Sequence, residues 1–245
     1  MNERVKGEEV RGGSMWGAAL AGAAGGVIAT VLLAVAGVQS GWGDRLVRQS
    51  LVGNPQILVE TADALRDSQY APVLAANRQA LETPFGSSWE GAAQPDVTLV
   101  EFYDYACGYC KASLPVVDRL LKEDPKLRVV YREFPILGPD SEAAARLSLA
   151  ASKAGRHKLF HDALYAAGRP SEATLRAATQ AAGIPYAPPI APEIDGELRR
   201  NFQLAQQLGA TGTPLFIVGD KVLNGAVGYE ALKKAIEDAR AAKRS

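Results

Sequence analysis

The longest apolar stretch of the chain lies near its N-terminus, at residues 15–38, and holds no charged residue. About 20 apolar residues are enough for a helix to cross a bilayer, so the pattern predicts a membrane anchor at 15–38. Three Lys or Arg residues precede it and two follow soon after it, which predicts a cytoplasmic stub at 1–14. A cleaved secretory signal is the alternative, because Ala34-Val35-Ala36 matches a small-x-small cleavage site. Both interpretations place the rest of the chain in an extracytoplasmic, periplasmic space.

Apolar residues between positions 44 and 80 recur at helical spacing and predict two short helices, separated by a break at Gly53-Asn54-Pro55. The apolar positions are Leu46, Val47, Leu51, Ile57, Leu58, Ala62 and Leu65. Such a stripe is unfavourable in water, so it must be covered either by the rest of the chain or by copies of itself. Residues 39–82 are therefore predicted to form a helical extension, and residues 44–80 are a candidate segment for homo-oligomer formation.

The hydrophobic period then changes to that of a buried β-strand. Val97–Tyr103 is rich in β-branched and aromatic residues, and its unbroken apolar run indicates burial on both faces. A helix is predicted from about Cys107 to Lys122, with Pro115 inside it, and a second strand at Leu127–Phe134. The order strand, helix, strand predicts a parallel, right-handed crossover.

Residues 141–208 have the helical period throughout. The predicted helices are Ser141–Ala154, Arg156–Ala167, Ser171–Ala182 and Pro192–Leu208, with Ser141 and Ser171 as N-caps. The chain returns to β-structure at 215–218 and 221–223 and ends in an amphipathic helix around Leu232 and Ile236. We therefore predict an α/β domain at 83–245 that carries a helical insertion at about 137–208.

Charge and cysteine content narrow the function classes. Lys plus Arg and Asp plus Glu each number 27, so no positive field attracts nucleic acid, and we expect no nucleic-acid partner. The chain has only two cysteines, too few for a structural disulfide framework. Its stability must come from a hydrophobic core.

The two cysteines, Cys107 and Cys110, enclose Gly108 and Tyr109 and allow three interpretations. With His157 and His161 they could bind zinc, but far more chain separates the two pairs than the roughly 12–15 residues of a zinc finger. The four-residue spacing of the two histidines is equally typical of a solvated helix face. A static disulfide would close too short a loop to stabilise the fold much. We therefore predict no metal site and no cofactor, and favour redox exchange.

The position of the pair supports redox chemistry. Cys107 opens a helix, where unpaired backbone N–H groups favour the thiolate, so we expect it to be exposed and Cys110 to be buried behind it. Glu101 lies within the preceding strand, where it either serves proton transfer beneath the thiols or faces solvent as a strand-end acid. Thr213-Pro214 directly precedes the strand at 215–218.

Several motifs together resemble the DsbA family of thioredoxin-fold oxidoreductases. They are FYDYACGYCK, the proline that follows it in the helix, the helical insertion, and GATGTP before LFIVGD. The resemblance covers about residues 83–245. It implies a thioredoxin fold in which Cys107 is the nucleophile, Cys110 the resolving thiol, Glu101 the buried acid, and Thr213-Pro214 a cis-proline loop.

Two departures refine the resemblance. Gly108-Tyr109 replaces the proline-histidine pair of the DsbA archetype and is similar to the centre of DsbC-type isomerases. Residues 44–67 resemble the N-terminal helices of the ScsC-like and Com1-like branch. The resemblance therefore implies either an oxidase or an isomerase.

The implied partners are cysteine-containing substrate proteins and a redox partner that resets the Cys107–Cys110 pair. Substrate segments would contact Gly108, Tyr109, Thr213 and Pro214, with the cis-proline loop pairing as an added strand. The alternative function is a redox-inactive peptide-binding or chaperone module that uses the same groove. The two intact cysteines favour the enzyme.

Overall fold

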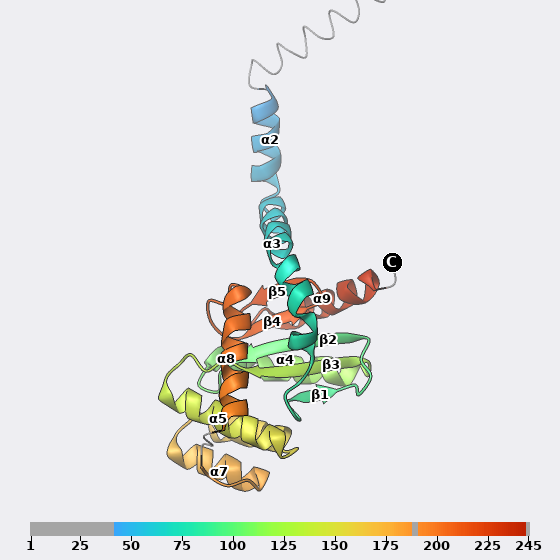
Figure 1. Ribbon diagram of the computed structural model, residues 1–245. Helices are drawn as coiled ribbons and strands as arrows, with labels where there is room; N and C mark the ends of the chain where they lie inside the picture. The colour runs from blue at the N-terminus through green and yellow to red at the C-terminus, as the bar shows by residue number, and fades with distance from the viewer. Residues whose placement is uncertain (1–41, 188–190, 244–245) are drawn as a thin grey trace, which may run out of the picture. The chain divides into compact units, whose positions relative to one another are not determined.

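The computed structural model describes residues 42–187 and 191–243, and the chain divides into two compact units, Met1–Ala62 and Asp63–Ser245 (Figure 1). In the described ranges, no helix combines the length and the apolar character needed to cross a bilayer. The predicted stub at 1–14 and the predicted anchor or signal at 15–38 lie outside the described residues.

The first unit contains α2 (Trp42–Gly53) and the beginning of α3 (Gln56–Glu82). The predicted break between two helices is confirmed and falls at Asn54 and Pro55. Most apolar side chains of the predicted stripe are exposed, to 62% at Leu46 and 55% at Leu58, while Leu51 is half-buried. The described part of the chain therefore leaves much of this apolar surface in contact with solvent.

The second unit is built on a five-stranded sheet in the order β1-β3-β2-β4-β5 (Figure 1). The strands are β1 (Trp89–Gly91), β2 (Val97–Tyr103), β3 (Leu127–Glu133), β4 (Leu215–Val218) and β5 (Lys221–Asn224). Strands β2 and β3 pair in parallel and are joined through α4 (Gly108–Glu123), so the predicted parallel pairing with a helix between the strands is confirmed. The other neighbours pair antiparallel. Strand β1 was not predicted, because three residues are too few to show a period.

The predicted helices form close to their expected bounds. They are α5 (Pro139–Lys153), α6 (His157–Ala167), α7 (Glu172–Ala182), α8 (Pro192–Gln207) and α9 (Gly228–Ala242). Ser171 caps α7 as predicted, in a capping box with Thr174. The predicted N-cap at Ser141 is wrong: α5 begins at Pro139 after Gly138, because proline at the first helical position has no N–H that needs a partner.

Both faces of the sheet are buried, as the run at Val97–Tyr103 predicted. Alternate residues of β2 enter two different clusters, since successive side chains of a strand point to opposite faces. Leu99 and Tyr103 pack with residues of α4, α5, α6 and α9, whereas Val100 and Phe102 pack with residues of α3 and α8. Glu101, which has the parity of Leu99 and Tyr103, therefore belongs to the first face.

The second half of α3 covers part of the other face. Leu74 and Leu81 are buried there, and the hydroxyl of Tyr70 lies against Gly209 at a position where a Cβ would collide with it. Arg78 forms an ion pair with Asp220. Of the extension predicted at 39–82, residues 63–82 thus belong to the same compact unit as the sheet.

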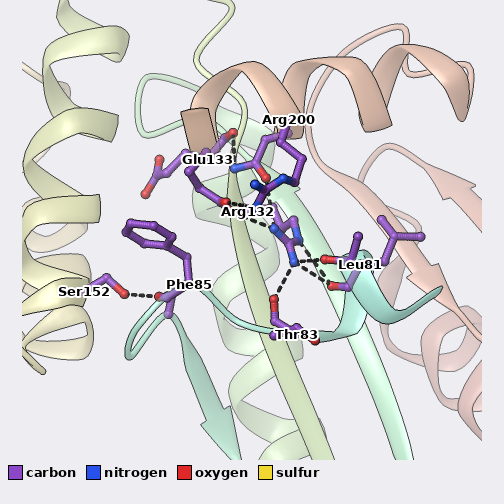
Figure 2. A network of polar contacts seen from close by, with 11 residues as sticks. Leu81, Thr83, Phe85, Arg132, Glu133, Ser152 and Arg200 are labelled. Atoms are coloured by element: carbon purple, nitrogen blue, oxygen red, sulfur yellow. Dashed lines mark hydrogen bonds and ion pairs between the residues drawn. The ribbon is translucent and has the colours of Figure 1, made fainter. Parts of the chain in front are cut away.

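A buried arginine joins α3, β3 and α8 (Figure 2). Arg132 on β3 donates hydrogen bonds to Glu197 (2.6 Å) and Asn201 (3.1 Å) on α8. It also donates to the carbonyl oxygens of residues 80, 81 and 83, at the C-terminal end of α3. Unpaired carbonyls at a helix end need donors, and a buried guanidinium has five N–H groups to give. We call Arg132, Glu197, Asn201 and these carbonyls the Arg132 clasp.

Candidate active site

The two cysteines lie at the start of α4, on the loop that leaves β2. Cys107 is the N-cap residue, with extended backbone angles (φ −81°, ψ 119°), and its N–H donates to the carbonyl oxygen of Asp104 at 3.0 Å. Cys110 follows in the first helical turn and faces the core. Both are free thiols. The sequence thus places one sulfur where the helix dipole favours negative charge and the other one turn behind it.

The expectation that Cys107 is exposed is wrong. Its side chain is only 8% exposed, because the segment before β4 covers it and its thiol donates to the carbonyl oxygen of Thr213 at 3.2 Å. The expectation that Cys110 is buried is confirmed, at 1% exposed. Burial raises the pKa of the Cys110 thiol, and Glu101 raises it further when its carboxyl group is ionised. Cys110 is therefore held as a neutral thiol.

The cis-proline loop lies beside the thiols. The Thr213–Pro214 peptide bond is cis, as the resemblance implies, and Pro214 leads directly into β4. The hydroxyl of Thr213 is buried and has no hydrogen-bond partner among the described residues. The carbonyl of Thr213, by contrast, is the acceptor for Cys107. Two segments that are distant in the chain thus meet at Cys107.

Glu101 is buried beneath the cysteines, so the alternative of a surface acid is wrong. It is 2% exposed and lies in the middle of β2, opposite Tyr131 of β3 and Phe216 of β4. Burial raises the pKa of Glu101 from 4.5 to about 8, and negative charge at Cys107 contributes to the increase. A carboxyl group with this pKa is mostly protonated at neutral pH. Because its pKa is close to neutral pH, it can also release that proton during a reaction.

Gly108 and Tyr109, between the cysteines, face solvent. The Tyr109 side chain is 70% exposed, and a Cβ at Gly108 would meet no atom within 4 Å. The two residues between the cysteines are therefore open to solvent, and they present one large aromatic side chain.

The interpretation of His157 and His161 as a solvated helix face is also wrong. Both are buried, and they accept or donate hydrogen bonds at the hydroxyls of Tyr103 (3.3 Å) and Tyr105 (3.2 Å) respectively. Burial lowers the pKa of His157 to about 3, so the ring is neutral. Within the described ranges, no three His, Cys, Asp or Glu side chains are grouped as metal ligands.

Sequence reasoning missed a second buried acid, Glu133, at the end of β3. It lies opposite Tyr103 in the parallel pair and accepts a hydrogen bond from that tyrosine's hydroxyl. Burial raises the pKa of Glu133 to about 8. The sequence did contain a signal for it: Glu133 is an acidic residue at the end of a predicted buried strand, and the neighbouring predicted strand ends in a tyrosine-rich segment. Asp104, between β2 and Cys107, was also missed.

The family model described as a DSBA-like thioredoxin domain matches residues 98–237, which include both cysteines and the cis-proline loop. The chain belongs to this family. Its thioredoxin-like α/β fold is thereby established, together with its place among the ScsC-like members.

Three solved structures illustrate the similarity. A thioredoxin-like oxidoreductase from Silicibacter pomeroyi is 38% identical, with a TM-score of 0.63 over 67% of this chain and 98% of its own. The catalytic domain of Proteus mirabilis ScsC is 26% identical, with a TM-score of 0.64 over 70% and 98%. A periplasmic thioredoxin-like protein from Salmonella enterica serovar Typhimurium is 29% identical, with a TM-score of 0.61 over 67% and 95%.

The curated relatives are longer proteins. One from Salinispora tropica, named Na(+)/H(+) antiporter NhaA 3, is 29% identical over 63% of this chain. The chain spans about a quarter of the length of the curated relatives it matches. The sequence similarity is therefore limited to about a quarter of each of those proteins.

Proposed function

We propose that this protein exchanges disulfides with cysteine-containing client proteins outside the cytoplasm, as an oxidase or an isomerase. The observation that carries the proposal is the arrangement of three groups. Cys107 opens α4 and contacts the cis-proline loop, Cys110 is buried one turn behind it, and the protonated Glu101 lies beneath both.

Oxidation of a client would proceed in two thiolate displacements. A client thiolate attacks Sγ of Cys107 in the Cys107–Cys110 disulfide, the S–S bond breaks, and the electron pair leaves on Cys110. Glu101 gives that sulfur its proton. A second client thiolate then attacks the client sulfur of the mixed disulfide, which forms the client disulfide and releases Cys107 as a thiolate. Two electrons pass from client to enzyme, and a redox partner removes them.

Isomerisation would start from the reduced enzyme. The Cys107 thiolate attacks a wrong client disulfide, and the displaced client sulfur leaves as a thiolate. That thiolate, or another in the client, attacks a different disulfide until one displaces Cys107 again. No net electron transfer occurs. The exposed Tyr109, with Gly108, Thr213 and Pro214, would hold the client strand near the sulfur.

We propose an extracytoplasmic, periplasmic location, with residues 15–38 as an inner-membrane anchor or a cleaved signal. The apolar run in the sequence and the periplasmic relative from Salmonella support it. Two free cysteines need an oxidising partner to act catalytically, which such a location can offer.

The function is tested against the alternative of a redox-inactive binding module. The protein is equilibrated with glutathione to measure the Cys107–Cys110 equilibrium constant, then given a reduced client and a client with scrambled disulfides. Wild type should restore client activity in at least one assay, and Cys107→Ser should abolish it. If wild type binds both clients but restores the activity of neither, and so behaves like Cys107→Ser, the protein is the redox-inactive binding module instead.

We further propose that α2 and the first half of α3 mediate self-association, which would hold several redox centres around one client. Leu46 and Leu58 are exposed on these helices, and burying a large aliphatic side chain stabilises an assembly by on the order of 1.5–3 kcal/mol.

Light scattering of residues 39–245 should give an oligomer at micromolar concentration. Leu46→Glu with Leu58→Glu should give a monomer that still exchanges disulfides but isomerises slowly, whereas Arg176→Glu, an exposed control on α7, should not change the mass. A monomeric wild type would contradict this.

A further inference from the structure

The loop that covers Cys107 is fastened at its two ends rather than along its length. At one end, Ala210 donates its N–H to the carbonyl oxygen of Ala205 in the last turn of α8, at 2.9 Å. At the other end, Pro214 leads directly into β4. Between them, the backbone of residues 211–213 forms a single hydrogen bond within the described ranges, the one it accepts from the thiol of Cys107. The position of the loop beside the sulfur therefore depends on how firmly its ends are held.

Tyr70 on α3 packs against the first of these ends. Gly209, just after α8, has a positive φ of 66°, the left-handed conformation that commonly ends a helix. A Cβ at Gly209 would overlap the hydroxyl oxygen of Tyr70 and would lie 2.8 Å from its Cζ. Tyr70 is half-buried and packs, like Ala210, against the apolar cluster of α3, α8 and the sheet. The contact is so close that a residue with a side chain does not fit at position 209.

We propose that Tyr70 is a positioning residue that, by packing on Gly209, holds the loop at 209–214 in place beside Cys107. The inference rests on the proposed function, because a client strand is expected to pair with this loop while its sulfur reacts. Tyr70 would act through the loop and would take no part in the bonds that form and break.

The physical reason is that a segment held only at its ends opens locally at a low cost in free energy. The Tyr70 side chain occupies the space next to Gly209, so its removal leaves that end of the loop without a packing partner on this side. Two effects of opposite sign are then expected. The loop covers Cys107 for less of the time, which favours attack on a small reagent. It is also less often in the position that aligns a client, which slows client exchange.

Gly183 provides a matched control for Gly209. It is the C-cap of α7 and has the same φ of 66°. The next residue, Ile184, donates its N–H to the carbonyl oxygen of Thr179, five residues back, which is the bond that Ala210 forms at the end of α8. A Cβ at Gly183, however, would meet no atom within 4 Å. Alanine therefore causes similar backbone strain at both glycines, but only at Gly209 does it also displace a neighbouring side chain.

The first experiment measures alkylation by iodoacetamide at neutral pH in the Cys110→Ser background, where Cys107 is the only thiol of the chain. The Cys107 thiolate attacks the reagent's carbon and iodide leaves, so mass spectrometry counts the product. Tyr70→Ala and Gly209→Ala should each raise the rate roughly 3- to 30-fold, the range that corresponds to contacts between neighbouring residues. Tyr70→Phe keeps the ring and should fall between wild type and Tyr70→Ala. Gly183→Ala should stay within about twofold of wild type, since it is not coupled to the loop.

A double variant separates the contact from the backbone strain at Gly209. Once the Tyr70 ring is absent, alanine at position 209 has no side chain to displace. Tyr70→Ala with Gly209→Ala should therefore react within about threefold of Tyr70→Ala alone. Rates that multiply would show that the two residues act independently and would overturn the proposal, as would an unchanged rate for Tyr70→Ala.

Low concentrations of urea distinguish opening of the loop from unfolding of the whole domain. Alkylation through a local opening exposes little surface and should not change with urea, whereas alkylation through global unfolding rises steeply with it. Tyr70→Ala should show the flat dependence. A steep rise from the lowest urea concentrations would mean that the variant has lost its fold generally, and would overturn the positioning role.

The last measurement uses the protein with both cysteines and a reduced or scrambled client. Tyr70→Ala should slow client exchange roughly 3- to 30-fold, while it speeds alkylation. Gly183→Ala should exchange at the wild-type rate. Exchange by Tyr70→Ala at the wild-type rate would overturn the positioning role. If wild type exchanges no client disulfides but the alkylation rates are as expected, Tyr70 still positions the loop, and the proposed function alone is overturned.

Discussion

Replacing Arg132 with methionine is expected to lower the free energy of unfolding by about 3–5 kcal/mol, the usual cost of removing one partner from a buried ion pair. The substitution leaves Glu197 inside the protein without its main partner, at a site where both side chains are almost fully buried. It also leaves the carbonyls at the end of α3 without donors. The measurement is urea denaturation of the reduced protein, followed by circular dichroism.

Two further variants make this result interpretable. Arg132→Met combined with Glu197→Met should regain part of the loss, because no charge is then left buried alone. Arg240→Met removes an arginine that also bonds two carboxylates, those of Asp96 and Asp124, but these groups are partly exposed. It should cost about 1 kcal/mol or less. Equal losses for Arg132→Met and Arg240→Met would show that the Arg132 clasp does not fasten α3 and α8 to the sheet.

Replacing Glu101 with glutamine is expected to flatten the dependence of stability on pH. The folded-state pKa of Glu101 is raised from 4.5 to about 8, chiefly by burial. A raised pKa means that its contribution to stability is fully present below pH 4.5 and is lost as pH rises through about 8. Within that window the unfolded chain ionises while the folded protein does not, and wild type loses roughly 1.4 kcal/mol for each pH unit from this group.

The test compares unfolding free energies of reduced wild type and Glu101→Gln from pH 4.5 to pH 8, the interval set by the two pKa values. The difference should grow in favour of the variant as pH rises. Glu237→Gln, on the exposed side of α9, should run parallel to wild type. Glu133 remains in both proteins and contributes the same slope to each, since burial also raises its pKa to about 8. Parallel curves for wild type and Glu101→Gln would show that Glu101 is ionised in the folded protein.

The same variant should slow exchange near neutral pH if Glu101 supplies the proton to Cys110.

Local periodicity was enough to predict most of the secondary structure. The strands at Val97–Tyr103 and 127–133 and the helix between them form as expected, since each is long enough to show its own period. Strand β1 has only three residues and exists because its backbone pairs with β3. The start of α5 was misplaced because Pro139, not Ser141, suits the first helical position.

The faces of the elements were harder to predict than their types. The spacing of His157 and His161 shows that they share one side of a helix, but not what covers that side. The tyrosines that cover it, Tyr103 and Tyr105, belong to the β2 strand and the loop after it. Likewise α3 has a helical period along its length, while the burial of Leu74 and Leu81 depends on the sheet face that receives them.

The sequence by itself determined the chemistry of this protein: two thiols one turn apart at a helix start, an acid in the strand before them, and a proline before a later strand. Only the tertiary structure decided how these groups are covered and bonded. Thr213 covers Cys107 from a distant part of the chain, loop 136–137 meets Asp104, and α8 meets Arg132. The physical reason is that a buried polar group must find its hydrogen-bond partners wherever the fold brings them, and sequence spacing carries no record of partners that lie far along the chain.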